Sequence, residues 1–237
     1  MVLKMANGTN KAEEFVTAHC DRTFLSLWGM ANPFGDDPGK ELCDYIVVCD
    51  PDVIIFSVKE VGLTPKAEPH GVERWLRKAV DNSLKQIYGA ERALACLDRV
   101  KDRRGRVINL PASQKRQLHR IAVAFGSGGH VPLAMGDFGH GFVHIMEERS
   151  FPTLLRELDT ISDLSAYLTH KAALIEANRR VFFSGEENLL ALYLSGNRAL
   201  PPGDVLFVDE DFWRAFTDSR EYKARREADR ASYPGIT

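Results

Sequence analysis

The sequence predicts an α/β protein in which a mixed sheet is flanked by helices. Two apolar runs, residues 42–49 and 53–58, are joined by Asp50-Pro51-Asp52, and this pattern predicts a tight hairpin of two buried strands. In residues 72–99, apolar positions recur at three- and four-residue spacing, which indicates a long helix. The apolar run 119–125 predicts a further buried strand. Strands and helices in this order favour a layered α/β fold.

The elements on either side of this core are predicted from local signals. Residues 10–20 form a short helix, with Asn10 as its N-cap and acidic residues in its first turn. Residues 23–28 have the β-branched and aromatic content of a short strand. We expect a core domain over residues 1–125 and a C-terminal extension over residues 126–237 that packs on it. That extension should hold a glycine-rich loop (126–141), a strand (142–146), and helices over 151–176, 186–194 and from 209 onward.

Composition excludes several classes of protein. With 237 residues, 44% hydrophobic and 27% charged, the chain is long enough and apolar enough for a folded core. It has no apolar run long enough to span a bilayer, and its polar N-terminus has no signal-peptide centre. The four cysteines have no CxxC spacing, so we expect reduced thiols and a cytoplasmic protein without a membrane partner.

Charge is distributed unevenly along the chain. Residues 66–120 hold fourteen Lys or Arg and six Asp or Glu, a balance of +8, so the rest carries −10 for the total to be −2. A basic middle segment of this kind offers one face to phosphates while the whole stays close to neutral. A solvated helix with long side chains explains the same charges, and the sequence alone leaves both interpretations open.

Two charged residues interrupt the predicted buried hairpin. Asp44 lies within the first apolar strand, and Lys59 ends the second. Burying an unpaired charge is costly, so each requires a partner or a function. A salt bridge at the end of the sheet is the structural explanation. A phosphodiesterase centre is the functional one, because such a centre needs carboxylates for a divalent cation and a cationic group beside the attacking water.

At these residues the sequence resembles the PD-(D/E)xK phosphodiesterase superfamily, which has a restriction-endonuclease-like fold. The resemblance covers about residues 14–125 and rests on the order α-β-β-β-α-β. Asp44 matches the strand aspartate and Ser57-Val58-Lys59 the (D/E)xK motif, while Gln86 matches a helix glutamine and Glu13 or Glu14 an acid on the first helix. The resemblance implies hydrolysis of phosphodiester bonds with Mg²⁺ or Mn²⁺. Asp44 would hold the metal, Lys59 would position the attacking water, and Gln86 and Glu14 would assist.

One position departs from the motif. Ser57 occupies the place of the second metal-binding carboxylate. Three acids could replace it: Glu73 near the start of the next helix, Glu60 beside Lys59, and Glu41 before Asp44. We favour Glu73, since strand alternation points Glu60 and Glu41 to the opposite face of a regular strand.

The long helix beside this motif carries Arg74, Arg77, Lys78 and Lys85, which we expect to contact phosphates of a nucleic acid, DNA first. No base-reading module is recognisable, so sequence specificity is not predicted. Two alternatives remain open. The chain could be a silent nuclease-fold module that binds nucleic acid or a protein, or a structural protein with a buried Asp44–Lys59 pair. Residues 126–237 are long enough to cover the site, bind a partner or form a homodimer.

Overall fold

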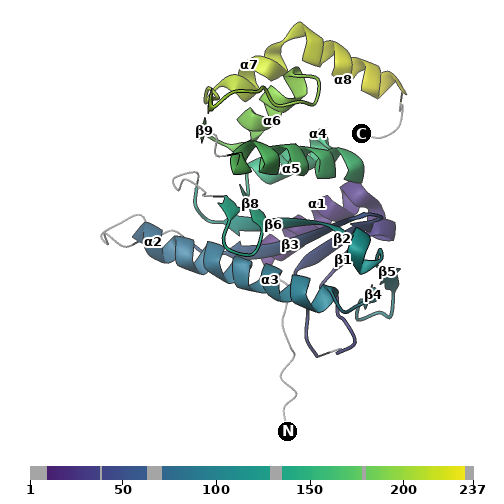
Figure 1. Ribbon diagram of the computed structural model, residues 1–237. Helices are drawn as coiled ribbons and strands as arrows, with labels where there is room; N and C mark the ends of the chain where they lie inside the picture. Colours follow the sequence, from purple (N-terminus) through teal and green to yellow (C-terminus); the bar gives the residue numbers. More distant parts are fainter. Residues whose placement is uncertain (1–9, 38, 63–70, 129–134, 178–179, 233–237) are drawn as a thin grey trace. The chain divides into compact units, whose positions relative to one another are not determined.

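The chain divides into two units, one reaching Ala172 and one starting at Ala173, and each is described by itself. A computed structural model describes residues 10–37, 39–62, 71–128, 135–177 and 180–232 (Figure 1). The division lies later than the predicted one after residue 125. Strands that follow residue 125 belong to the main sheet, which is why the first unit extends beyond the predicted boundary.

The first unit is built on a mixed sheet, as the sequence predicts. Within the described ranges this sheet has six strands in the order β1-β2-β3-β6-β8-β7. The first three strands pair antiparallel, β3, β6 and β8 run parallel, and β7 pairs antiparallel with β8. The strands are β1 (Gly29–Ala31), β2 (Tyr45–Cys49), β3 (Asp52–Glu60), β6 (Gln117–Phe125), β7 (Gly136–Asp137) and β8 (Phe142–Glu147).

Helices cover both faces of this sheet (Figure 1). Because side chains alternate along a strand, Ile46 and Ile55 pack in one core cluster with residues of α3 (Asn82–Leu94). Tyr45 and Phe56 point to the other face, where the Tyr45 hydroxyl donates to Asp21 of α1 (Lys11–Trp28) at 2.6 Å. The Phe56 ring meets Phe151 of α4 (Ser150–Glu157) edge to face, with ring centroids 6.1 Å apart. A sheet buried on both sides accounts for the continuous apolar runs in the sequence.

Helix α1 confirms one prediction and overturns another. The Asn10 side chain accepts a hydrogen bond from the Glu13 backbone N–H at 2.8 Å, so Asn10 is the N-cap. The prediction of a strand over residues 23–28 is wrong, because α1 continues to Trp28 and β1 begins only at Gly29. Phe24 extends the buried stripe of Val16 and Cys20 at four-residue spacing, so packing against the sheet outweighs the β-propensity of this segment.

The predicted long helix is divided by a wider turn. It consists of α2 (Gly71–Leu76), a π-helical turn (Arg77–Asp81) and α3, which ends at Leu94 rather than Arg99. Its buried positions Trp75, Ala79, Ser83 and Ile87 recur every fourth residue. In a regular α-helix this spacing drifts by about 40° per step, or about 120° over three steps. The π-helical turn takes up about one extra residue and keeps these side chains on one face.

Other elements complete the two units. After α3, β4 (Arg99–Lys101) and β5 (Val107–Asn109) form a hairpin, and the predicted helix 151–176 is divided into α4 and α5 (Ile161–Glu176).

The second unit confirms its expected helices and adds a pair of parallel strands. Its core cluster includes Leu174, Leu189 and Val208. Its elements are β9 (Arg180–Phe182), α6 (Glu186–Ser195), β10 (Val205–Phe207), α7 (Phe212–Asp218) and α8 (Arg220–Ser232). Within the described ranges no helix combines the length and the apolar character needed to cross a membrane.

A buried histidine of the first unit predicts how stability depends on pH. His144 is 3% exposed, and its Nδ1 has no hydrogen-bond partner among the described residues. Burial, with smaller contributions from Lys171, His119 and Arg120, holds the pKa of His144 well below its usual 6.5. The unfolded chain therefore binds this proton first. The free energy of unfolding should be highest above pH 6.5 and fall by up to about 1.4 kcal/mol per pH unit below it.

Chemical denaturation of the wild type and of His144→Leu between pH 5 and 8 measures this effect. The wild type should lose more stability than the variant on acidification, whereas His170→Leu, at an exposed position, should follow the wild type. Parallel profiles for the wild type and His144→Leu would contradict the assignment.

Candidate active site

The hairpin register places Asp44 on the face of the sheet that α3 covers. Asp44 lies directly before β2, and its backbone N–H donates to the Phe56 carbonyl at 3.1 Å, which continues the β2–β3 ladder. Since Tyr45 pairs with Phe56, Asp44 lies opposite Ser57. Alternation then places Ser57 and Lys59 on the same face as Asp44.

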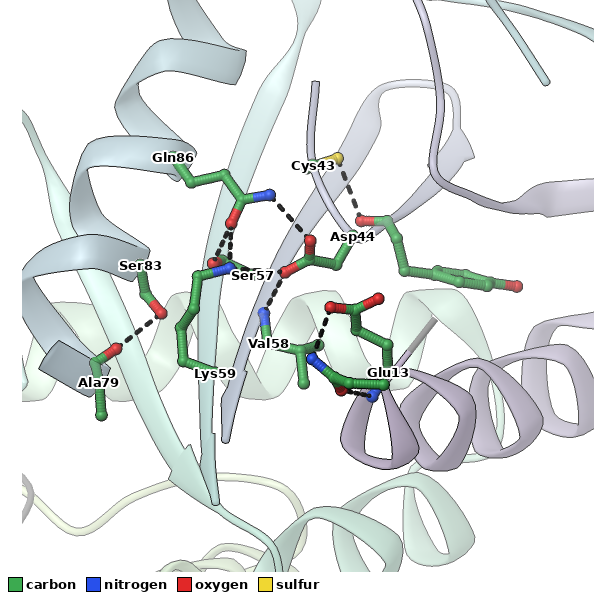
Figure 2. Close-up of polar contacts among 11 residues, drawn as sticks. Glu13, Cys43, Asp44, Ser57, Val58, Lys59, Ala79, Ser83 and Gln86 are labelled. Carbon is green, nitrogen blue, oxygen red and sulfur yellow. Dashed lines mark hydrogen bonds and ion pairs between the residues drawn. The ribbon is translucent and has the colours of Figure 1, made fainter. Parts of the chain in front are cut away.

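Four side chains meet at this point (Figure 2). The Asp44 Oδ1 accepts from Gln86 Nε2 at 2.8 Å, and its Oδ2 accepts from the Val58 backbone N–H and lies 3.3 Å from Lys59 Nζ. The Gln86 Oε1 accepts from Lys59 Nζ at 2.6 Å and from Ser57 Oγ at 2.8 Å. Gln86 on α3 therefore joins both strands, and its amide has a defined orientation because each end has its own partner.

The ion pair is buried at one end and open at the other. The Asp44 side chain is 6% exposed and that of Lys59 is 28% exposed. A buried carboxylate is tolerated only when donors replace its lost water, and Asp44 has three of them. The Lys59 side chain is partly open to solvent, so a ligand can approach it from outside.

Two further carboxylates lie within electrostatic range of this pair. Burial raises the pKa of Glu13 and of Glu41, and the negative charge of Asp44 raises both further, while Lys59 lowers them. Glu13 also raises the pKa of Glu41. Glu13 comes from the first turn of α1, and Glu41 from the segment before β2. Two acids whose ionisation is opposed by burial and by the charge of Asp44 provide the electrostatic condition that a bound cation relieves.

The donor set of this site fits a hard divalent cation. Among the described residues, no three His, Cys, Asp or Glu side chains converge as a preformed metal cage. Mg²⁺ does not need such a cage, because it keeps several waters and takes one or two carboxylates. The Asp44 Oδ1 accepts one hydrogen bond and retains acceptor capacity, and Glu13 and Glu41 supply further oxygens. Mn²⁺ accepts the same ligands.

The structure locates each acid suggested for the site. On the first helix, half-buried Glu13 faces Asp44, while the predicted Glu14 is exposed. Glu41 is half-buried beside Asp44, whereas Glu73 is exposed on α2 and Glu60 is exposed at the end of β3. The signal for Glu13 is its position three and seven residues before Val16 and Cys20, which are buried.

The basic residues of the middle segment have two kinds of surroundings. Arg106 and Arg116 donate to backbone carbonyls, and Arg120 pairs with Glu91 at 2.6 Å, so these three stabilise the fold. The predicted phosphate contacts Arg74, Arg77, Lys78 and Lys85 all have exposed side chains. Lys85 precedes Gln86 and lines a groove with it, which connects Lys85 to the network of Asp44.

Neither protein-family models nor curated proteins nor solved structures match this chain.

The charge coupling among the three acids gives a direct test of the site. In Asp44→Asn, the pKa of Glu13 and of Glu41 should fall toward the usual value, because one negative charge is removed while burial remains. Carboxyl carbon chemical shifts followed through a pH titration measure both groups. Asp36→Asn, at an exposed loop position, is the matched control and should change neither. Unchanged titrations in Asp44→Asn would show that the three acids do not share one site.

Proposed function

We propose that this protein is a metal-dependent nuclease of the PD-(D/E)xK type that hydrolyses phosphodiester bonds in DNA. The observation that carries the proposal is the meeting of Asp44 and Lys59 at 3.3 Å on neighbouring strands, with Lys59 reaching solvent. Lys59 is held by strand pairing and Asp44 by its backbone hydrogen bond to Phe56, and Gln86 holds both side chains. Such rigidity suits a reaction that depends on positioning.

The order of elements supports the same proposal. Helix α1, strands β1 to β3, the α2–α3 helix and β6 follow one another as the superfamily resemblance implies, with the β4–β5 hairpin inserted. Strands β3 and β6 are parallel, and Lys59 and Glu60 lie at the end of β3 beside Ala124 and Phe125. We therefore assign the first unit to the restriction-endonuclease-like fold as part of the proposal.

Each residue has a role in the proposed hydrolysis. The water oxygen loses a proton and forms a bond to phosphorus, while the bond from phosphorus to the leaving sugar oxygen breaks and that oxygen takes up a proton. Asp44, with Glu13 or Glu41, would hold Mg²⁺ or Mn²⁺, which supplies charge neutralisation and lowers the pKa of bound water. Lys59 donates to the attacking water and balances charge on the phosphoryl oxygens. Gln86 holds the Lys59 ammonium group and the Asp44 carboxylate in place.

A second candidate function follows from Ser57. This residue is fully buried and donates to Gln86 at the position where an acid is expected. If neither Glu13 nor Glu41 completes the metal shell, the protein is a silent module that binds nucleic acid or a protein partner without cutting. Free Cys20 and Cys43, both buried, fit the cytoplasm as the compartment for either function.

The nuclease proposal predicts specific losses of activity. With plasmid and single-stranded DNA in Mg²⁺ or Mn²⁺, Lys59→Ala and Asp44→Asn should each lower the cleavage rate by about 100-fold or more, because each removes a group acting on the reacting atoms. EDTA should abolish cleavage. Lys115→Ala changes an exposed lysine just before the start of β6, the end opposite the site, and should cleave like the wild type.

Thermal unfolding of each variant separates loss of chemistry from loss of fold. Identical products from wild type and Lys59→Ala would overturn the nuclease proposal. Salt-sensitive DNA binding without cleavage by the wild type would favour the silent module instead.

A further inference from the structure

A groove opens directly beside the Asp44 network. It lies between the segment before β2, which contributes Lys40, Glu41 and Leu42, and one face of α3. Its volume is about 330 Å³, which is at the small end of the range for ligand sites. Gln86 and Glu41 both line the groove. Gln86 donates a hydrogen bond to Asp44, and the charge of Asp44 raises the pKa of Glu41. The groove therefore begins at the proposed site of chemistry.

The floor and the rim of this groove differ in chemistry. Leu42, Ala90 and Ala93 provide apolar surface, and Gly89 leaves space between them. A Cβ added at Gly89 would have the Arg92 guanidinium, at 4.0 Å, as its nearest side-chain neighbour. Lys40, Lys85 and Arg92 stand around this floor as cations. A flat apolar ring and an adjoining anion would both be accommodated.

These three cations are not engaged in holding the fold. The side chains of Lys40, Lys85 and Arg92 have no ion pair or hydrogen bond among the described residues, and all three residues are exposed. Arg106, Arg116 and Arg120, by contrast, are committed to backbone carbonyls and to Glu91. Three cations available to a ligand therefore stand around the groove, and Gln86, which lines it, is bonded to Lys59.

We propose that this groove holds one unpaired nucleotide of the substrate strand beside the bond that is cut, so that the protein acts on single-stranded or frayed DNA. This inference rests on the proposed nuclease function and names its substrate class. The base packs on the apolar floor, and the flanking phosphates lie at the cationic rim. A base within a duplex enters such a groove only after unstacking and unpairing, at a cost of a few kcal/mol.

The substitution Gly89→Leu tests this inference without weakening the helix. It fills the open space of the groove, and leucine is a better helix former than glycine by about 1 kcal/mol. Fluorescence anisotropy in EDTA with a labelled single-stranded 12-nucleotide thymidine oligomer should show Kd about tenfold higher for Gly89→Leu than for wild type. The matched Gly89→Ala adds one methyl group and should bind with a Kd close to that of wild type. The oligomer annealed to its complement should bind wild type about tenfold more weakly than the single strand.

The cationic rim is tested separately by salt. Lys85→Gln combined with Arg92→Gln should flatten the dependence of log Kd on log salt by up to about 1.4, at about 0.7 for each phosphate contact with a single strand. Lys115→Gln with Arg99→Gln removes the same charge from exposed positions outside the groove and should leave the slope unchanged.

The outcomes separate this inference from the nuclease proposal. Unchanged single-strand binding in Gly89→Leu, or equal binding of duplex and single strand, overturns the inference even if cleavage depends on Lys59. Lost binding in Gly89→Leu, without any cleavage by the wild type, overturns the nuclease proposal and retains the groove as a nucleotide site.

Discussion

The carboxylate of Asp44, almost wholly removed from water, is satisfied by donors from separate parts of the chain. The Val58 amide and the Lys59 ammonium group come from β3, and the Gln86 amide comes from α3. If the hairpin slipped by one residue, Asp44 would turn to the other face, toward the aromatic packing of Tyr45 and Phe56. The charge therefore stabilises a single register and a single placement of α3.

Much of this arrangement is predictable from local patterns, because it depends on the period-two alternation of a hairpin. Asp44 and Lys59 stand out as charges in apolar runs, and the order of elements indicates the helix that brings Gln86. The predicted helix at residues 10–20 is too short, because two local patterns conflict over residues 23–28: β-propensity favours a strand, whereas Phe24 continues the four-residue spacing of Val16 and Cys20. Packing against the sheet decides for the helix. Glu13 and Glu41 approach Asp44 only once α1 and the segment before β2 are in place.

The charge balance of residues 66–120 indicates a basic segment, but packing determines which of its side chains are available to a ligand. The balance of +8 over residues 66–120 is a property of the sequence, but it treats every arginine alike. In the folded chain Arg116 donates to carbonyls at the end of α3 and just beyond it, whereas Arg92 is without a partner among the described residues. A guanidinium group with several donors serves either purpose, so its neighbours determine which one it serves.

The π-helical turn at Arg77–Asp81 has a consequence for how this protein can change over evolutionary time. The turn fixes the rotation about the helix axis that relates the Trp75 side chain, before the turn, to the Gln86 side chain, after it. Losing a single residue there would rotate everything beyond it by about 100° and point Gln86 away from the sheet. Substitutions of exposed residues in the turn keep the number of residues and therefore leave this rotation unchanged. The segment should therefore tolerate drift in composition and resist any change in length.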